Sequence, residues 1–547
     1  MFCTGSTAAC IVHGLKALRA LLPEPRAVTG PDFGLGLLLV SLHILALLPA
    51  PTRGWRLTRA ALGPLIGAAW AYLGYVPIMR TPQERWGGNL LFWFFAARAI
   101  EHLVVFTPEF EVYRLRPVTS RTESKGRRGL EPEPIPQPWT WAKLGWAASL
   151  WWSWRGIGWN FAAPLTESQA SEPFTRDTPR WHHIRCRLLH LLGVYVLDSL
   201  AAIYMHVRMP QFFIAHTLKY AELTTGQRAA VSIATVARII ASVNLSHLQL
   251  GLAAVAVGGV FGLKGEVWEP WGWPSMFGSI KDIWRNPGVN YVWAKAWNQY
   301  NRRTYHIWAW VGLGEGVLGL PSSGLQLNRH AVARPSSVSV PVLSGATKRR
   351  SRPVLSGNIS PNVTTPPVSG SSSSTLEFEL KSVGISTAQL GPPTPPTSPP
   401  PTPGRAGMWA NLVKSVLVFT LSGLYHDISS VLVLLDTLGR GENINPWHVL
   451  TLSPFFLVQP LAIATEALLV PRYRVIRRKR GIPRHGKSPL LALVERSVGF
   501  ACVWLWLGWS AGFFVEGMAR LGVWRVWEAT PLDWNVSLFV PIWNAVM

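Results

Sequence analysis

The sequence predicts an all-α, polytopic membrane protein that crosses the bilayer about eight or nine times. Three observations support this prediction. Apolar residues make up 48% of the 547 residues, and charged residues only 15%. The chain contains 29 tryptophans, and tryptophan is enriched where a membrane meets water. Apolar runs of roughly 20 residues, the length that a membrane-crossing helix needs, recur along most of the chain.

The first 30 residues are predicted to form an N-terminal amphipathic or flexible segment (1–30). Polar residues break its apolar run, so that it does not have the pattern of a secretory signal. Four apolar residues recur there at helical spacing: Ile11, Leu15, Leu18 and Leu22. We therefore expect a helix that lies in the membrane interface.

The first part of the membrane body is predicted over residues 31–318. Its candidate spans lie at roughly 33–51, 60–79, 88–107, 187–207 and 229–263. The last of these stretches is long enough for one or two crossings. Residues 139–163 are rich in tryptophan but too short of a clean apolar run, so we expect them at the interface.

Residues 319–407 differ in kind from the rest of the chain. They are rich in Ser, Pro and Thr, as in SGSSSST and GPPTPPTSPPPTPG. Such a segment cannot bury enough apolar surface to offset the entropy lost on ordering, and it is predicted to be a disordered cytosolic insertion. The second part of the body follows at 408–547, with candidate spans near 409–436, 446–470 and 492–517.

The net charge of +24 is carried mostly by loops between apolar runs. This distribution indicates that the basic residues orient the protein in the membrane by the positive-inside rule, and it argues against nucleic-acid binding. The basic stretch PRYRVIRRKRGIPRHGK at 471–487 should then face the cytosol, together with 264–408 and the loop after the third span. This orientation requires an even number of crossings between residues 187 and 263.

The stretch LSGLYHDISS at 421–430 places an imidazole, His426, inside an apolar run. Most histidines in such runs donate one N–H to a backbone carbonyl and have no further role. Ionisable groups at membrane depth are costly, however, and usually face a cavity or a pathway. A neutral imidazole there can act as a general base toward an alcohol. Asp427 should point about 100° away on the helix, so we do not expect it to bind His426 directly.

The second candidate site is VWAKAWNQYNRR at 292–303. Trp293 and Trp297 are spaced to share a helix face, and Asn298 follows them. One interpretation is an interfacial helix with a basic edge. The other is an amide that holds a carbonyl or hydroxyl, beside cations that bind the phosphates of an anionic cosubstrate. The cations of this second interpretation are Lys295, Arg302 and Arg303.

These stretches together resemble the membrane-bound O-acyltransferase superfamily in its wax-synthase-like branch. The branch pattern WP-x-x-FGS is present at 273–279, its Trp-rich helix at 292–299, and F-x-x-SG-x-x-H at 419–426. RGIGWN at 155–160 and FFLVQP at 455–460, with Glu466 beyond, also match. The Trp-rich helix departs from the branch pattern, because Ala294, Lys295 and Ala296 replace its Gly-Arg-Arg.

The resemblance implies an acyl-CoA:alcohol O-acyltransferase with His426 as the catalytic base and Asn298 as its polar partner. It implies an integral, multi-pass protein, which we expect in the endoplasmic reticulum. The cosubstrate would be acyl-CoA, with acetyl-CoA favoured, and the acceptor a hydrophobic alcohol such as a terpenoid or other secondary metabolite. We expect no bound cofactor, because direct transfer needs none, and no metal, because the sequence has no evident cluster of metal ligands.

Three alternatives remain open from the sequence. The chain could be a long-chain wax-ester synthase that acts on fatty alcohols. It could be a transporter with His426 in a proton path, although transporters often show repeated halves with broken helices and no such repeat is evident in the sequence. It could also be a non-catalytic membrane protein that acts through its insertion. The oligomeric state is not predicted.

Overall fold

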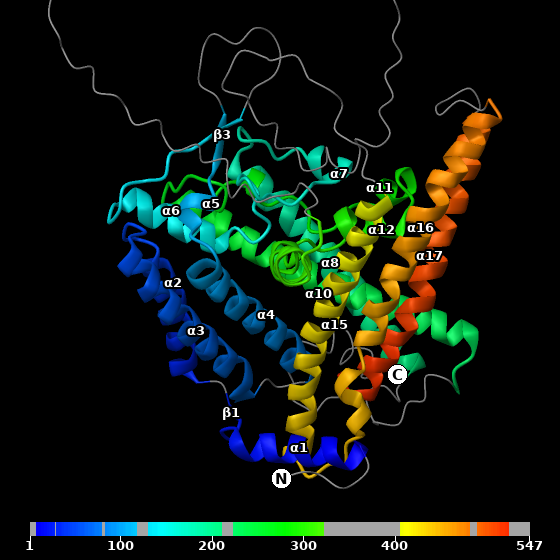
Figure 1. Cartoon of the computed structure of the whole chain (residues 1–547), viewed down its shortest axis with the longest axis horizontal. Helices are drawn as coiled ribbons and strands as arrows, with labels where there is room; N and C mark the ends of the chain where they lie inside the picture. Colours follow the sequence, from blue (N-terminus) through cyan, green and yellow to red (C-terminus); the bar gives the residue numbers. More distant parts are fainter. Residues whose placement is uncertain are drawn as a thin grey trace, which may run out of the picture. The chain divides into compact units, whose positions relative to one another are not determined.

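The computed structural model describes residues 7–27, 29–78, 82–117, 130–209, 222–321, 405–481 and 489–523. The chain separates into two units, and the first comprises residues 1–323 and 403–547. The second unit, residues 324–402, lies outside the described residues, as does nearly all of the predicted insertion at 319–407. The first unit is built almost entirely of helices (Figure 1).

Six helices in the described residues are long and apolar enough to cross a membrane, in agreement with a multi-pass helical membrane protein. They are Arg85–Val105, Arg180–Arg208, Thr225–Val260, Gly407–Gly439, Trp447–Lys479 and Pro489–Arg520. The expected count of eight or nine is not confirmed. One predicted span became α2 (Gly30–Ala46), which is apolar but only 17 residues long. Another became α3 (Arg53–Tyr75), whose first two turns carry three arginines.

Shorter elements connect the long helices. The helical ones are α5 (Pro108–Glu111), α6 (Trp141–Trp152), α7 (Glu167–Ala170), η3 (Pro270–Gly272), α11 (Ile280–Arg285), α12 (Val289–Tyr291), η4 (Val292–Ala296), α13 (Arg302–Tyr305), η5 (His306–Val317) and η6 (Pro446–Leu450). The strands form two short pairs. β1 (Arg26–Ala27) runs parallel to β2 (Pro77–Ile78), and β3 (Leu115–Pro117) antiparallel to β4 (Leu130–Pro132).

The expected N-terminal amphipathic helix is present as α1 (Thr7–Leu21). Its Leu15 is buried in one apolar cluster with Tyr75 at the end of α3 and with Leu432 and Leu435. The apolar face of α1 is therefore covered in part by other helices of the same unit.

α3 packs closely against α4 (Pro82–Ile100) and its π-helical continuation η1 (Glu101–Val105). Glycine makes this approach possible, because a Cβ added at Gly63 would lie 2.5 Å from the side chain of Val104. The start of α3 and the end of η1 are consequently neighbours at one end of this helix pair.

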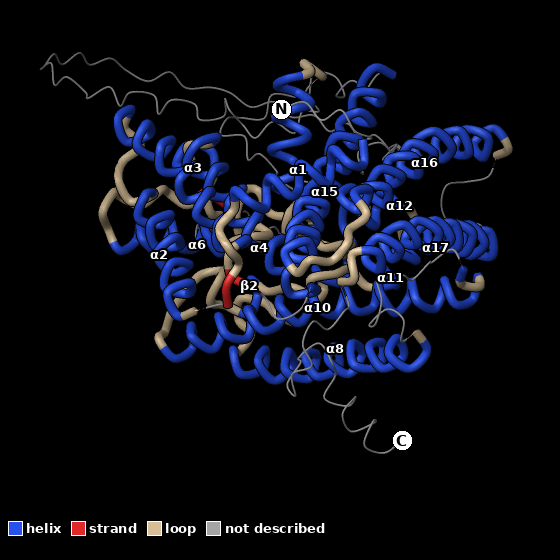
Figure 2. The backbone as a smooth tube through the Cα atoms, turned by 90° about the horizontal axis from the view of Figure 1, so that it is seen from below, coloured by secondary structure: helices blue, strands red, loops and turns tan. Residues whose placement is uncertain are grey.

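α8 (Arg180–Arg208) and α10 (Thr225–Val260) run side by side as an antiparallel pair (Figure 2). Arg180 at the start of α8 donates to the carbonyl oxygen of Gly258 near the end of α10, at 2.7 Å. Residues 229–260 belong to the single helix α10 and not to two spans. The region from 187 to 263 therefore holds two candidate spans, the even number that the charge distribution requires.

The tryptophans of 139–163 lie mainly inside the unit and only in part on its surface. Trp146, Trp151 and Trp159 are at most 2% exposed and belong to one core cluster, whereas Trp139 and Trp141 are 69% and 86% exposed. This stretch was expected at the membrane interface. Most of these rings instead stabilise the packing of α6 against α2 and its neighbours.

The last three long helices are α15 (Arg405–Gly439), α16 (Ser453–Lys479) and α17 (Pro489–Arg520). α15 and α17 both pack on α16 (Figure 1). The predicted basic loop begins as helix, because α16 continues to Lys479. On α15, the fully buried Lys414 donates to Glu315 at 2.7 Å and to the carbonyl oxygen of Pro321 at 2.6 Å.

Candidate active site

His426 lies in the middle of α15, one helical turn after Ser422. Its Nδ1 is 2.6 Å from the backbone carbonyl oxygen of Ser422. A carbonyl oxygen can only accept a hydrogen bond, so Nδ1 carries the proton in the neutral imidazole. The other nitrogen, Nε2, then has a free lone pair, and no residue in the described part of the chain donates to it. His426 is thus in the tautomer that a general base requires.

Aromatic side chains surround the imidazole of His426. Its ring centroid lies 4.5 Å from that of Phe456, 5.7 Å from that of Trp86 and 6.5 Å from that of Phe514. These three rings come from α16, α4 and α17 and are each less than 10% exposed. His426 therefore lies where three separate helices meet α15, in surroundings of low polarity.

Asp427 has a structural partner and does not contact His426, as the helix geometry predicted. Its carboxylate accepts hydrogen bonds from the backbone N–H groups of Leu452 and Ser453, at 2.9 and 3.2 Å, and from the Ser453 hydroxyl. Gly423 allows the close approach, since a Cβ there would lie 2.9 Å from the Ser453 oxygen. Asp427 thus fixes the start of α16 against the turn of α15 that carries His426.

The Trp-rich stretch is not the regular helix that the sequence predicts. The π-helix η4 ends at Ala296, Trp297 is extended, and a turn leads into α13 and then the π-helix η5. The two tryptophan rings are still neighbours, with centroids 5.5 Å apart between Trp293 and Trp297. π-Helical segments are often found at functional sites.

Asn298 lies in the turn between η4 and α13. Its Oδ1 accepts a hydrogen bond from the backbone N–H of Tyr300, at 2.8 Å. Because a backbone N–H can only donate, this contact identifies the amide oxygen and leaves the two Nδ2 hydrogens as the available donors. Such donors are the type of group that stabilises an oxyanion.

The segment that carries Asn298 contacts α15 on both sides of this residue. Before it, the Trp293 ring lies 5.6 Å from Phe419. After it, the Tyr305 ring lies 6.1 Å from Tyr425, the residue before His426. No contact between the side chains of Asn298 and His426 is found in the described residues. The structure therefore brings together their two segments, across the insertion that separates them in sequence.

Two residues of α16 hold the Trp-rich segment in place. Gln459 accepts hydrogen bonds at Oε1 from the indole N–H groups of Trp293 and Trp506, both at 3.2 Å. Glu466 accepts the backbone N–H groups of Val289 and Asn290 at the start of α12. In the sequence, FFLVQP and Glu466 were only matches to the branch pattern. In the structure, Gln459 of this motif and Glu466 connect the part of the body before the insertion to the part after it.

The three predicted phosphate-binding cations are already engaged within the chain. Arg302 donates to the carbonyl oxygen of Ala294 and to the Gln299 amide oxygen. Arg303 is 9% exposed and forms a buried ion pair with Glu101 of η1. Burial, and next the charge of Arg302, lower the pKa of Lys295, whose ammonium lies 6.0 Å from the ring of Tyr291. Phosphate binding by these residues stays a prediction.

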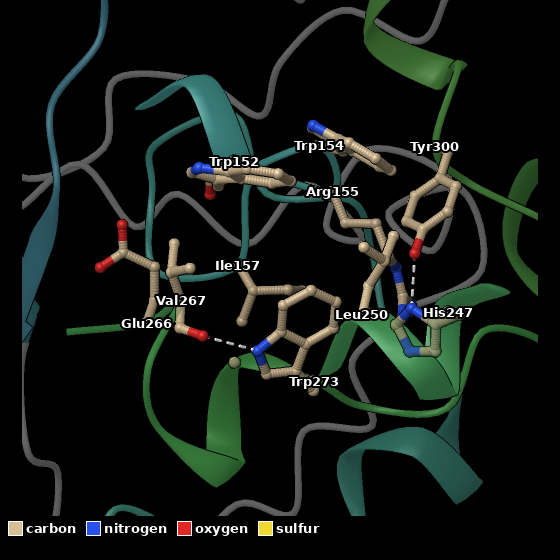
Figure 3. A pocket seen from close by; sticks show the side chains of 12 residues that line it. Trp152, Trp154, Arg155, Ile157, His247, Leu250, Glu266, Val267, Trp273 and Tyr300 are labelled. Atoms are coloured by element: carbon tan, nitrogen blue, oxygen red, sulfur yellow. Dashed lines mark hydrogen bonds between the residues drawn. The ribbon is translucent and has the colours of Figure 1, made fainter. Parts of the chain in front are cut away.

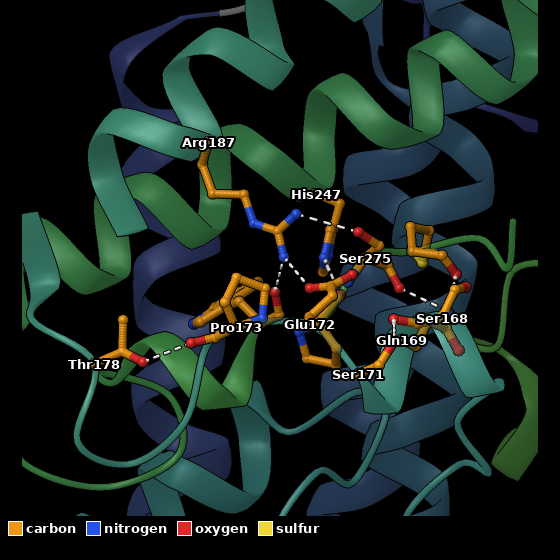
Figure 4. Close-up of polar contacts among 12 residues, drawn as sticks. Ser168, Gln169, Ser171, Glu172, Pro173, Thr178, Arg187, His247 and Ser275 are labelled. Carbon is orange, nitrogen blue, oxygen red and sulfur yellow. Dashed lines mark hydrogen bonds and ion pairs between the residues drawn. The ribbon is translucent and has the colours of Figure 1, made fainter. Parts of the chain in front are cut away.

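The loop WPSMFGS is attached to the same segment. The N–H of Gly278 donates to the carbonyl oxygen of Ala296 at 2.8 Å, and a Cβ at Gly278 would lie 3.1 Å from the Ala296 backbone. In Figure 4, Arg187 of α8 reaches both Glu172 and the Ser275 hydroxyl, at 2.6 and 3.2 Å. The loop is therefore bound to α8 on one side and to η4 on the other.

A second buried histidine, His247 of α10, also holds this loop. Its Nε2 lies 3.0 Å from the carbonyl oxygen of Pro274, and its Nδ1 lies 2.5 Å from the Tyr300 hydroxyl. His247 therefore donates to Pro274 and accepts from Tyr300. Both side chains line a small pocket of about 30 Å³ with walls of Trp152, Trp154 and Trp273 (Figure 3). Arg155 of RGIGWN also lines it and donates to Pro274 and Ser275.

The sequence did not indicate the side chains that surround His426. Trp86 and Phe514 lie far from His426 in the chain, and no local pattern connects them to it. Tyr305 had a weak signal, because it closes the NRRTY run after Asn298. Burial raises its pKa to about 12, so its hydroxyl stays protonated. No cluster of three or more potential metal ligands occurs among the described residues.

Comparison with known proteins finds a similarity to an acetyltransferase from Arthrobotrys oligospora. The two sequences are 30% identical over 166 residues, which are 30% of this chain. The match spans about a third of that protein, 32% of its length. No family model matches the chain, and no solved structure matches it. The similarity supports a relation to acyltransferases; it does not confirm the resemblance to the membrane-bound O-acyltransferase superfamily.

Proposed function

We propose that the protein is a membrane-bound acyl-CoA:alcohol O-acyltransferase of the wax-synthase-like branch. It transfers an acyl group, in our proposal acetyl, from acyl-CoA to a hydroxyl of a hydrophobic alcohol such as a terpenoid or another secondary metabolite. The observation that carries this proposal is the hydrogen bonding of His426. Its Nδ1 proton is held by the Ser422 carbonyl, which leaves Nε2 free to accept a proton from an alcohol.

The reaction needs no covalent intermediate with the protein. The alcohol loses its proton to Nε2 of His426 while its oxygen attacks the thioester carbonyl carbon. The tetrahedral intermediate then expels the CoA thiolate as the carbon–sulfur bond breaks. The imidazolium returns the proton to this thiolate, so that ester and CoA leave and His426 is neutral again.

Asn298 is proposed as the donor for the oxyanion. Its Oδ1 is occupied by the N–H of Tyr300, so its Nδ2 hydrogens are the groups that can point to a developing negative charge. The aromatic rings around His426 support a dry reaction chamber. Exclusion of water there would favour transfer to the alcohol over hydrolysis of the thioester.

An acetyl donor is favoured by the name of the similar protein, which is called an acetyltransferase, and by the resemblance to the wax-synthase-like branch. A long-chain wax-ester synthase remains the second candidate, since the same base and amide would serve it equally well. We place the protein in the endoplasmic reticulum, with acyl-CoA arriving from the cytosol, and we retain Lys295, Arg302 and Arg303 as candidate phosphate contacts.

The decisive test is ester formation by isolated membranes supplied with labelled acetyl-CoA and a pool of lipophilic alcohols. Wild type should form ester, and His426→Ala should not, at matched protein levels. A panel of donors from acetyl-CoA to palmitoyl-CoA would then assign the chain length. Use of long chains alone would replace the acetyl donor by a fatty acyl donor. Ester formation unchanged in His426→Ala would remove the base from the mechanism.

The two non-enzymatic alternatives predict a different result. A transporter or a non-catalytic interaction protein would form no ester with any donor in the panel. A transporter would in addition move a substrate across sealed vesicles in a manner that depends on the proton gradient and on His426.

A further inference from the structure

A cavity of about 280 Å³ lies between the start of α3 and the end of η1, away from the residues of the candidate active site. Arginines line its polar side and apolar residues the other side. Those used in the argument are Arg53, Arg56, Leu57, Arg59, Val104 and Phe106. The cavity thus offers cations and apolar surface to the same occupant.

The charges around this cavity do not balance. Arg59 is buried and pairs with Glu109 at 2.7 Å, and Lys143 shares the same carboxylate at 3.3 Å. Arg53 and Arg56 are exposed and form no ion pair in the part of the chain that the structure describes. Four cations therefore stand against one carboxylate, and the two unpaired ones line the cavity.

The α3 helix adds to the positive potential. Arg53 and Arg56 lie in its first turn, where the helix dipole is positive and backbone N–H groups lack helical partners. Thr52 caps one of these groups, the N–H of Trp55, at 3.3 Å. A negative group in the cavity would be stabilised both by the guanidinium groups and by this helix end.

The apolar side of the cavity is open to the surroundings. Leu57 is 67% exposed and Val104 is 42% exposed, while Phe106 is buried beside them. The candidate span Arg85–Val105 ends here, so the cavity lies at the level where an apolar helix surface gives way to polar residues. By the charge-based orientation this is the cytosolic side of the membrane.

We propose that the cavity binds a phosphate group attached to an apolar chain. The phosphate would contact Arg53 and Arg56, and the chain would lie on Leu57 and Val104. Two molecules at this membrane surface carry that chemistry: an anionic phospholipid and acyl-CoA. The second source rests on the proposed function, and the first does not.

One ring contact connects the wall of the cavity to the segment that follows Asn298. Phe106, which lines it, lies 5.7 Å from the guanidinium of Arg303. Arg303 is two residues from Tyr305, whose ring contacts Tyr425 beside His426. The wall of the cavity and the segment that carries Asn298 are thus in contact through Phe106 and Arg303.

The proposal is tested by ligand-dependent thermal stability of the purified full-length protein in neutral detergent. Coenzyme A and dioleoyl phosphatidic acid are titrated separately, with dioleoylglycerol as the lipid that lacks the phosphate. The pocket variants are Arg53→Gln/Arg56→Gln and Leu57→Glu. All three side chains are exposed, so these changes should not affect folding. The matched control is Arg478→Gln/Arg480→Gln, which removes two exposed charges at the end of α16.

We expect at least one phosphate ligand, and not dioleoylglycerol, to raise the melting temperature of the wild type. The apparent affinity for this ligand should fall about tenfold or more in Arg53→Gln/Arg56→Gln, because the charge-assisted hydrogen bonds to the phosphate are lost. It should also fall in Leu57→Glu, because the new carboxylate repels the phosphate. The control should bind as the wild type does.

The pattern of losses identifies the source of the phosphate. Weaker binding of phosphatidic acid alone assigns the cavity to lipid, and weaker binding of coenzyme A alone assigns it to the cosubstrate. Equal binding by wild type and pocket variants, equal loss in the control, or no binding by the wild type would each overturn the proposal. None of these readouts requires ester formation, so the result is independent of the acyl-transfer test.

Discussion

Two histidines in long apolar helices, His247 in α10 and His426 in α15, have opposite hydrogen-bonding environments. Both nitrogens of His247 are occupied, one by the Pro274 carbonyl at 3.0 Å and one by the Tyr300 hydroxyl at 2.5 Å. Only Nδ1 of His426 is occupied, by the Ser422 carbonyl at 2.6 Å, among the residues that the structure describes. Histidine thus has a structural role in α10, where it joins two segments by hydrogen bonds, and is a candidate base in α15.

The difference shows what distinguishes a structural histidine from a reactive one inside a membrane protein. Burial does not separate them, because aromatic rings surround both. The distinguishing property is whether the second nitrogen keeps an available lone pair. Four experiments on these two histidines and on their neighbours Asn298 and Tyr300 test the comparison, in order of decreasing effect.

The largest effect is expected from His426→Gln compared with His247→Gln. Loss of a general base lowers a rate by about 10²–10⁴, so the rate of ester formation by His426→Gln should be lower than that of the wild type by this factor. His247→Gln should keep most of its acyl-transfer activity per folded protein, measured as ester formed after size-exclusion chromatography. Similar losses in the two variants would mean that the lone pair on Nε2 does not set them apart.

Asn298→Ala should have the next largest effect. Removal of one oxyanion donor typically costs about 10²–10³ in kcat, while KM for acetyl-CoA should change little because the donor acts on charge that develops only in the transition state. Initial rates over a range of acetyl-CoA concentrations separate the two constants. Asn286→Ala, which removes an amide at the end of α11, serves as the control. A rise in KM with an unchanged kcat would assign Asn298 to binding and not to the transition state.

The loss of folding stability should be larger on substitution of His247 than of His426, the reverse of the order expected for activity. His247→Phe leaves the Tyr300 hydroxyl without its acceptor, at about 1–3 kcal/mol of unfolding free energy for that buried group. It also removes one of the two donors to the Pro274 carbonyl, which keeps its hydrogen bond from Arg155 at 2.9 Å. His426→Phe loses only one bond and places an aromatic ring among aromatic rings. Melting temperatures in detergent should therefore be lower for His247→Phe. The opposite order would contradict the structural role of His247.

The smallest effect is expected from Tyr300→Phe. This change removes the hydroxyl that donates to Nδ1 of His247. A water can take its place, because both residues line the tryptophan-walled pocket. The unfolding free energy should fall by about 0.5–1.5 kcal/mol. Acyl transfer should stay near the wild-type rate, because the backbone N–H of Tyr300 still holds Asn298. A large loss of activity would indicate that the hydroxyl itself takes part in the reaction.

Much of the helical architecture follows from hydropathy alone. α15 was expected at 409–436 and extends over Arg405–Gly439, because one long apolar run leaves little choice. Charge also settled a point that hydropathy left open, the single helix α10 where two spans were considered. These features depend on composition and length, which are local properties of the chain.

The parts that could not be predicted depend on contacts between distant residues. The ion pair of Arg303 joins it to Glu101, which is 202 residues away in sequence, and no local pattern around Arg303 indicates this partner. Phosphate binding by Arg303 stays a prediction. The break of the Trp-rich helix after Ala296 was also missed, because a period of 3.6 residues does not reveal a π-helical turn. The free nitrogen of His426 follows from its backbone contact, and nothing in LSGLYHDISS specifies that contact.

The hydrogen bonds of Lys414 have a practical consequence for protein engineering. This side chain ties α15 to Glu315 and Pro321, so the chain is anchored just before residue 322 and shortly after residue 405. A fluorescent protein or affinity module spliced between these points would begin and end at fixed positions of the membrane body. The insertion is therefore the place where such a module can be added with the least disturbance to His426 and Asn298.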